Sequence, residues 1–196
     1  MISPENTAQL NNKVSVNSYK HHISKTINQQ SIPSSLPLGG LGWVLDMKTV
    51  IQRVSRASVT IGGEVKSAIR KGYLILLGVA DTDTEEDVDW LVKKTAALRI
   101  FDDAEGVMNL PVTAVGGEIL VVSQFTLLAS YKKGNRPSWI HAARHEVSIP
   151  LYESFCEKLR RETGLKVLTG EFGADMKVEL VNDGPVTICM DTKHKE

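Results

Sequence analysis

Two short polar stretches of the chain carry residues whose types could do chemistry. The first is SQFTL, residues 123–127, which follows directly on the apolar run EILVV. The hydroxyl and amide side chains of Ser123, Gln124 and Thr126 surround Phe125 at the point where a buried strand should end. Such donors could form the floor of a pocket and point at a substrate carbonyl. For an isolated stretch of this kind, polar residues that simply end a strand are the commoner explanation.

The second stretch is NDGPVT, residues 182–187, near the end of the chain. Asn182, Asp183 and Gly184 are typical turn residues, and an apolar strand follows them. Pro185 nevertheless removes a backbone donor at the first position of that strand. An X-Pro bond is also the one peptide bond at which the cis form costs little. The pattern leaves two alternatives, a hairpin turn and a rigid backbone probe.

The signatures of several common enzyme classes are absent from the sequence. It contains no GxGxxG after a strand, no P-loop, no HExxH and no GxSxG. His141 and His145 are four residues apart, a spacing that would suit a metal on one face of a helix. No clear third ligand is nearby, and two surface histidines beside a basic loop are the favoured explanation. Spacing alone leaves a Ser-His-Asp triad open, because its members meet only in space.

Composition limits the class of protein. Lys and Arg together number 23, as do Asp and Glu, so the formal net charge is zero and bulk binding of a polyanion is not expected. Cys156 and Cys189 show no ligand spacing and predict reduced thiols in a cytoplasmic protein. No apolar run approaches the roughly 18 residues that a membrane span needs. We therefore predict a cytoplasmic globular protein without a membrane segment.

The chain divides into two parts at Met47. Residues 1–46 are rich in Ser, Asn and Gln, show no sustained periodicity, and include the linker-like SIPSSLPLGGLG. We predict a disordered N-terminal extension there, and a start codon assigned too early is an alternative. Residues 47–196 carry the ordered pattern and form the predicted functional domain.

Apolar periodicity in the second part predicts many strands and two helices. Strands are expected in residues 48–54, 57–63 (with Gly62-Gly63 as a turn), 73–80, 118–127, 166–170, 176–181 and 185–190, with a hairpin tip in residues 102–106. One helix should begin after a Thr82 or Thr84 cap, and the other should span residues 148–164 with Pro150 in its first turn. The predicted class is α+β, with mostly antiparallel, barrel-like β-sheets and the two helices packed outside.

These stretches together resemble the D-aminoacyl-tRNA deacylase family. The resemblance covers residues 47–191 and rests on QRV, LRIF followed by MNL, GGEILVVSQFTL, KGNRPS, FGADM and NDGPVT, all in the order of the family. SQFTL and NxGPVT are its two signature motifs, and both are present without a mismatch. Residues 1–46 have no counterpart, and IHAARHEVS after RPSW departs from the family pattern.

The resemblance implies a reaction, a partner and an assembly. Members hydrolyse the ester that joins a D-amino acid to the 3′ acceptor end of tRNA, and glycyl-tRNA mischarged on tRNA-Ala is also expected to be cleaved. They are homodimers that use neither a metal nor another cofactor. In the family, the peptide that corresponds to Gly184-Pro185 is cis and reaches into the active site of the other subunit, where it rejects L-amino acids.

The resemblance also assigns site residues. Ser123, Gln124, Phe125 and Thr126 correspond to the catalytic pocket, and backbone N–H groups near Phe125 and Thr126 are candidates for an oxyanion hole. Arg53 and Asn182 are expected to support the Gly184-Pro185 loop. Thr126 as nucleophile is one alternative; assistance by the 2′-hydroxyl of the terminal adenosine is the favoured one, because no base adjoins Thr126 in sequence. The stretch YKKGNRPSW, residues 131–139, is the expected phosphate contact.

Two competing functions come from other classes. One is a catalytically silent dimer that binds the tRNA end, which the intact SQFTL and NDGPVT motifs disfavour. The other is a serine or cysteine esterase that uses Ser123 or Cys189, which the absence of a nucleophile elbow and of a histidine near either motif disfavours.

Overall fold

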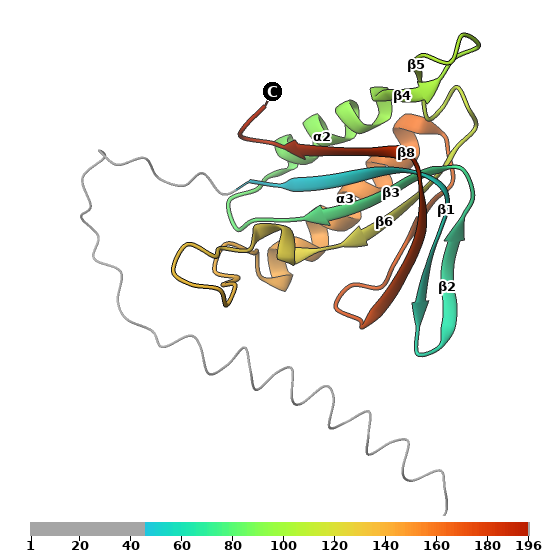
Figure 1. Ribbon diagram of the computed structural model, residues 1–196. Helices are drawn as coiled ribbons and strands as arrows, with labels where there is room; N and C mark the ends of the chain where they lie inside the picture. The colour runs from blue at the N-terminus through green and yellow to red at the C-terminus, as the bar shows by residue number, and fades with distance from the viewer. Residues whose placement is uncertain (1–45, 196) are drawn as a thin grey trace, which may run out of the picture. The chain divides into compact units, whose positions relative to one another are not determined.

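The computed structural model describes residues 46–195 (Figure 1). The extension predicted for residues 1–46 lies, apart from Asp46, outside the described residues. No helix among the described residues is both long enough and apolar enough to cross a membrane.

A six-stranded mixed sheet dominates the fold. Its strands are β1 (Lys48–Ile61), β2 (Glu64–Ile69), β3 (Gly72–Gly78), β6 (Glu118–Ser123), β7 (Val167–Thr169) and β8 (Met176–Asp191). They follow the order β2-β1-β3-β6-β7, and β8 pairs with the other edge of β1 (Figure 1). The pairs that include β1 are antiparallel, whereas β3 with β6 and β6 with β7 are parallel. The Ser67 hydroxyl of β2 donates to the Thr169 carbonyl of β7 at 2.7 Å, so the sheet is nearly closed.

Smaller elements complete the fold. The strands β4 (Arg99–Asp102) and β5 (Met108–Pro111) form a separate hairpin, which projects from the body in Figure 1. Within the described residues the two α-helices are α2 (Glu85–Ala97) and α3 (His145–Thr163), and the short 3-10 helix η1 (Phe125–Leu128) follows β6. The predicted α+β class with a barrel-like sheet and two helices is confirmed.

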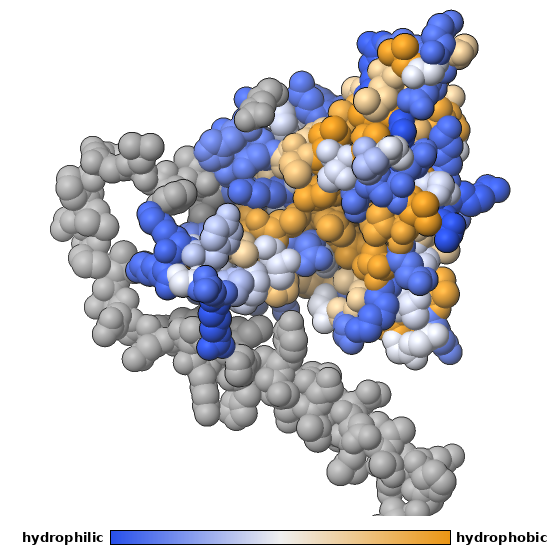
Figure 2. Space-filling model, in the orientation of Figure 1, coloured by the Kyte–Doolittle hydropathy of each residue, from blue (hydrophilic) through white to orange (hydrophobic). Residues whose placement is uncertain are grey.

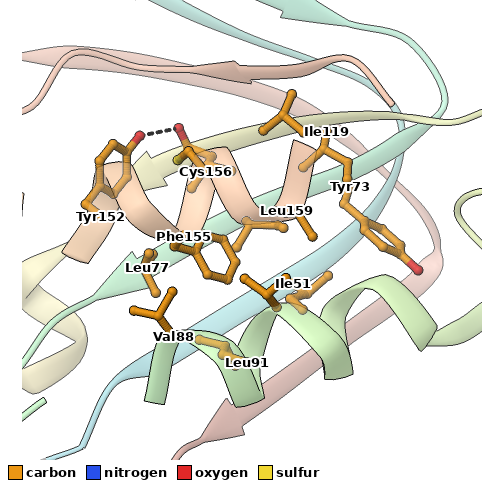
Figure 3. Close-up of a cluster of buried hydrophobic side chains, with 14 of the residues drawn as sticks. Ile51, Tyr73, Leu77, Val88, Leu91, Ile119, Tyr152, Phe155, Cys156 and Leu159 are labelled. Carbon is orange, nitrogen blue, oxygen red and sulfur yellow. Dashed lines mark hydrogen bonds between the residues drawn. The ribbon is translucent and has the colours of Figure 1, made fainter. Parts of the chain in front are cut away.

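The helices cover one face of the sheet and enclose the main core. Phe155 and Leu159 of α3 and Leu91 of α2 are fully buried against the strands (Figure 3). Alternate residues of β3 point to opposite faces, so Ile75 joins this core while Leu74 joins a second cluster inside the curved sheet. Burial on both faces explains the continuous apolar run of this strand. Cys156 fills space in the main core, and burial raises the pKa of its thiol to about 12.

Helix α2 begins as predicted and α3 does not. Thr84 is the N-cap of α2, with its backbone N–H bonded to the Asp87 carboxylate at 2.9 Å. Helix α3 begins at His145 and not at Ser148, so Pro150 lies inside the helix and the first-turn prediction is wrong. The Ser148 N–H and hydroxyl both bond to the Arg144 carbonyl, at 2.8 and 2.9 Å, which fixes the first turn before Pro150.

Two predictions of separate strands are also wrong. Residues 48–54 and 57–63 contribute to the single strand β1, and residues 176–181 and 185–190 to the single strand β8. The reason is that β1 and β8 pair with each other over their whole length. Gln52 pairs with Thr187 and Val54 with Asn182, so residues 183–186 of β8 oppose Arg53 alone and form a bulge without ending the strand.

Candidate active site

The SQFTL stretch forms a tight turn at the end of β6. Ser123 is the last residue of the strand, and η1 begins at Phe125. The Gln124 N–H donates to the Leu77 carbonyl at 2.7 Å, which holds the turn against the end of the parallel neighbour β3. A Cβ at Gly78 would lie 2.9 Å from the Gln124 carbonyl oxygen, so this close approach depends on glycine. The turn is therefore held at a fixed position beside β3.

The polar side chains of this turn, Ser123, Gln124 and Thr126, are half-buried, whereas Phe125 is exposed. Gln124 Nε2 donates a short hydrogen bond to Thr126 Oγ1. The Phe125 and Thr126 N–H groups lie at the first turn of η1, where backbone donors have no partner within a helix. Among the described residues, no hydrogen bond joins Ser123, Thr126 or Cys189 to a histidine. The contacts present therefore resemble those of a polar binding turn and include no base paired with a nucleophile.

The bulge of β8 contains the cis peptide bond between Gly184 and Pro185. Asn182 spans the bulge: its Oδ1 accepts the Val186 N–H at 2.8 Å, and its Nδ2 donates to Thr187 Oγ1 at 3.2 Å. Gly184 has a φ of 134°, and a Cβ there would lie 2.7 Å from Val186 Cγ2. Only glycine suits this backbone and this spacing.

Arg53 holds the same bulge from β1. Its side chain is buried, and its Nε donates to the Asp183 carbonyl at 2.8 Å. Its Nη1 donates to the Ile100 carbonyl at 2.7 Å and to Asp102 Oδ1 at 3.2 Å. One guanidinium thus ties the bulge to the start of the β4–β5 hairpin. The sequence prediction did not include Ile100 or Asp102 in this arrangement, because nothing local marks them as partners of Arg53.

The two groups of predicted site residues lie at different levels of the sheet. Ser123 pairs with Leu77 and Leu77 with Thr49, whereas Arg53 pairs with Tyr73. Four residues along a strand correspond to about 13 Å. The strand β3 also separates β6 from β1. The register therefore does not place the SQFTL turn of one chain beside its own Gly184-Pro185 bulge.

The remaining histidines and carboxylates fall elsewhere. The His145 ring packs edge-on against Phe172, with centroids 5.5 Å apart, and His141 is half-buried. Within residues 46–195, the cluster with metal-ligand spacing is Asp46, Asp191 and His194, which the sequence did not single out. Asp46 Oδ2 lies 2.9 Å from His194 Nδ1. Burial raises the pKa of Asp46, and the hydrogen bond with Asp46 raises the pKa of His194.

Comparisons with known proteins identify the family. Residues 50–191 match the family described as D-Tyr-tRNA(Tyr) deacylase. A protein of Phocaeicola vulgatus named D-aminoacyl-tRNA deacylase is 65% identical over 150 residues, which cover 76% of this chain and all of that protein. A solved structure titled "c-Myc DNA Unwinding Element Binding Protein" is 44% identical, covers 73% of this chain and 97% of its own, and has a TM-score of 0.69. A structure titled as a probable eukaryotic D-amino acid tRNA deacylase shares the fold at 17% identity, with a TM-score of 0.65 over 74% of this chain and 99% of its own.

The chain therefore belongs to the D-Tyr-tRNA(Tyr) deacylase family. Its enzyme class is that of the D-aminoacyl-tRNA deacylases, ester hydrolases that act in the proofreading of translation.

Proposed function

We propose that the chain hydrolyses the ester of D-aminoacyl-tRNA in the pocket formed by Ser123, Gln124, Phe125 and Thr126, and that Gly184-Pro185 rejects L-amino acids there. The observation that carries this proposal is the pair of fixed backbone features, the SQFTL turn and the β8 bulge, in a chain of this family. In this proposal residues 47–196 form the catalytic domain. The reaction takes place in the cytoplasm, and water is the second substrate.

Catalysis in this proposal depends on positioning. The oxygen of a water molecule bonds to the ester carbonyl carbon, the bond to the ribose oxygen breaks, and that oxygen receives the proton released by water. Backbone N–H groups at Phe125 and Thr126 stabilise the negative charge that develops on the carbonyl oxygen. The Thr126 hydroxyl already accepts a hydrogen bond from Gln124, and no histidine in residues 46–195 bonds to it. We therefore assign assistance of the attack to the 2′-hydroxyl of the terminal adenosine.

Selection between enantiomers requires a barrier that cannot move aside. The two enantiomers have the same size and polarity, so an apolar pocket alone discriminates poorly, and a steric clash with the L side chain is needed. The backbone atoms of Gly184 and Pro185 have no rotamers, and Arg53 and Asn182 hold them in place. Glycine has no side chain to clash, so glycyl-tRNA mischarged on tRNA-Ala is also a substrate.

A homodimer would bring the two features together. Within one chain they lie about 13 Å apart along the strands. Strand β8 pairs with β1 alone among the described strands, so the bulge borders a free sheet edge. Apolar surface gathers around β8 and β1 on the face shown in Figure 2. Unpaired edges and apolar patches are typical of association sites. We assign the bulge of one subunit to the pocket of its partner.

The test uses purified protein with D-tyrosyl-tRNA, L-tyrosyl-tRNA and the simple ester p-nitrophenyl acetate. Rapid cleavage of the D-substrate alone supports the proposal. Equal cleavage of the L-substrate contradicts the selection step, hydrolysis of the simple ester alone favours a general esterase, and binding of tRNA without turnover favours the silent binding dimer. Sedimentation should give twice the chain mass of 21.5 kDa, and dilution into monomers should reduce activity and enantiomer selection together.

A further inference from the structure

Two exposed aromatic rings adjoin the SQFTL turn. Phe125 is 45% exposed and Trp139 is 41% exposed, and an exposed apolar patch is more informative than a single exposed apolar residue. The rings meet edge to face, with centroids 5.2 Å apart and an angle of 78° between their planes. Because Phe125 lies between Gln124 and Thr126, this aromatic pair, Phe125 with Trp139, borders the proposed catalytic turn. The proposed hydrolysis uses the backbone N–H of Phe125 but assigns no role to the two rings.

The aromatic pair is held rigidly at the end of β3. On one side, the Gln124 N–H binds the Leu77 carbonyl at 2.7 Å. On the other side, the Ala143 N–H binds the Val79 carbonyl at 2.9 Å, and the Ala142 N–H binds the Trp139 carbonyl at 3.0 Å. The segments that carry both aromatic residues are thus anchored at Leu77, within β3, and at Val79, just after its end. A preformed surface of this kind binds a flat ligand without first having to be ordered.

The charge beside the aromatic pair is positive. No Asp or Glu occurs between Glu118 and Glu146, although the whole chain has equal numbers of acids and bases. Lys132, Lys133 and Arg136 lie on a loop whose ends are closed by two hydrogen bonds of 2.8 Å between Ser130 and Ser138. Trp139 follows directly on Ser138, so the ring lies at the base of this cationic loop. If a ligand that covers the ring carries negative charge, that charge therefore lies near the positive charges of the loop.

We infer that Phe125 and Trp139 form a stacking platform for the unpaired nucleotide immediately 5′ of the terminal adenosine of the substrate RNA. The inference rests on the proposed function, which places the terminal adenosine and its ester at the neighbouring turn. A nucleobase supplies the flat face, and its phosphates supply the charge that the loop of residues 131–137 complements. Rings next to a cationic groove are the usual means of binding single-stranded nucleic acid.

The kinetic test compares a D-aminoacyl-adenosine, which lacks the 5′ nucleotide, with a D-aminoacyl CCA trinucleotide. For each variant the measured quantity is the ratio of kcat/KM for the trinucleotide to kcat/KM for the adenosine ester. Trp139→Ala should lower this ratio roughly 5- to 150-fold, the range of one base–aromatic stack. Trp139→Phe should restore most of it. The control is Ile140→Ala, which removes an apolar side chain that is 73% exposed and has no ring, and should leave the ratio within about two-fold.

A binding measurement tests the inference without turnover and without relying on Trp139→Ala to fold. Uncharged CpCpA should quench the tryptophan fluorescence of the wild-type protein more strongly than adenosine does, and Trp139→Phe should lose that difference. An unchanged kinetic ratio in folded Trp139→Ala, or equal quenching by CpCpA and adenosine, would overturn the inference. A change from dimer to monomer in Trp139→Ala would also overturn it, because the rings would then be covered by a second copy. Failure of the proposed function looks different, since the wild-type protein would cleave neither ester.

Discussion

Arg53 lies opposite the four-residue bulge of β8 and donates from its Nε to the Asp183 carbonyl at 2.8 Å. The two residues are 130 positions apart in the sequence. The same guanidinium also binds the Ile100 carbonyl and Asp102, so the bulge, β1 and the β4–β5 hairpin share one buried cation. The position of Gly184-Pro185 therefore depends on a buried side chain from a strand that is distant in the sequence.

Replacing Arg53 should weaken both stability and selection. Arg53→Met leaves the Ile100 and Asp183 carbonyls without their donor, and each unsatisfied buried group costs about 1–3 kcal/mol. We expect a loss of about 2–4 kcal/mol in the free energy of unfolding and a fall of at least about tenfold in the ratio of D- to L-tyrosyl-tRNA cleavage. Urea denaturation and deacylation assays measure the two effects. Arg56→Met, an exposed arginine on the same strand, is the matched control, and an equal D/L ratio in both variants would contradict the role of Arg53.

Gly184→Ala tests the bulge itself. The φ of 134° and the 2.7 Å approach to Val186 Cγ2 leave no room for a side chain, and backbone strain of this kind costs about 1–3 kcal/mol. We expect lower stability and reduced rejection of L-tyrosyl-tRNA. Gly173→Ala serves as the control, because that residue also has a positive φ but a Cβ there meets nothing within 4 Å. If Gly184→Ala loses stability but still rejects L-tyrosyl-tRNA as well as the wild type does, the bulge has no role in enantiomer selection.

Thr126→Ala should retain substantial activity if the RNA 2′-hydroxyl assists the attack. The variant loses the acceptor of the Gln124 hydrogen bond but keeps the backbone N–H groups of η1. We expect the single-turnover rate on D-tyrosyl-tRNA to fall less than about tenfold, a smaller effect than the removal of a general acid or base. Complete loss, with recovery in Thr126→Ser, would instead assign Thr126 as the nucleophile.

Asp83 should make stability depend on pH. Burial raises the pKa of this carboxyl from 3.8 to about 7, although it accepts the Ala80 N–H at 2.6 Å. A carboxyl whose folded-state pKa is raised binds more protons in the folded than in the unfolded state, so stability falls as pH rises from about 4 to about 7. Asp83→Asn should therefore be more stable than the wild type at pH 8, by about 2–4 kcal/mol, and the difference should vanish near pH 4. Denaturation at several pH values measures this difference in the free energy of unfolding. Asp175→Asn is the control, because its carboxyl is exposed. Parallel pH profiles of Asp83→Asn and the wild type would disprove the role of Asp83.

The cationic loop should give RNA binding a dependence on salt. Removing one phosphate contact lowers the slope of log K against log salt concentration by about 0.7 for a single strand. We expect Arg136→Gln to show this change when binding of uncharged tRNA is measured between low and physiological salt. Arg70→Gln is the control, since its side chain is 91% exposed and pairs with Glu118 at the opposite end of β6. Identical slopes in the two variants would exclude Arg136 as a phosphate contact.

The sequence by itself determined the features that depend on neighbours along the chain. A helix cap at Thr82 or Thr84, the apolar run of β3 and the α+β class follow from local propensity and periodicity. The SQFTL and NDGPVT stretches are recognisable as short strings of residue types, and with the other matching stretches they predicted the family that the comparisons confirm. These features need no knowledge of distant contacts, because short-range sterics and the burial pattern decide them.

Only the tertiary structure decided which distant segments meet. It joined the predicted pieces of β1 and of β8 into two long strands, because their mutual pairing continues past the interruptions that turn residues suggest. It placed Asp183 and Ile100 around Arg53, Trp139 against Phe125, and the SQFTL turn at a different sheet level from the Gly184-Pro185 bulge. These contacts depend on strand register and on burial across the whole sheet. No local pattern of residues therefore specifies them.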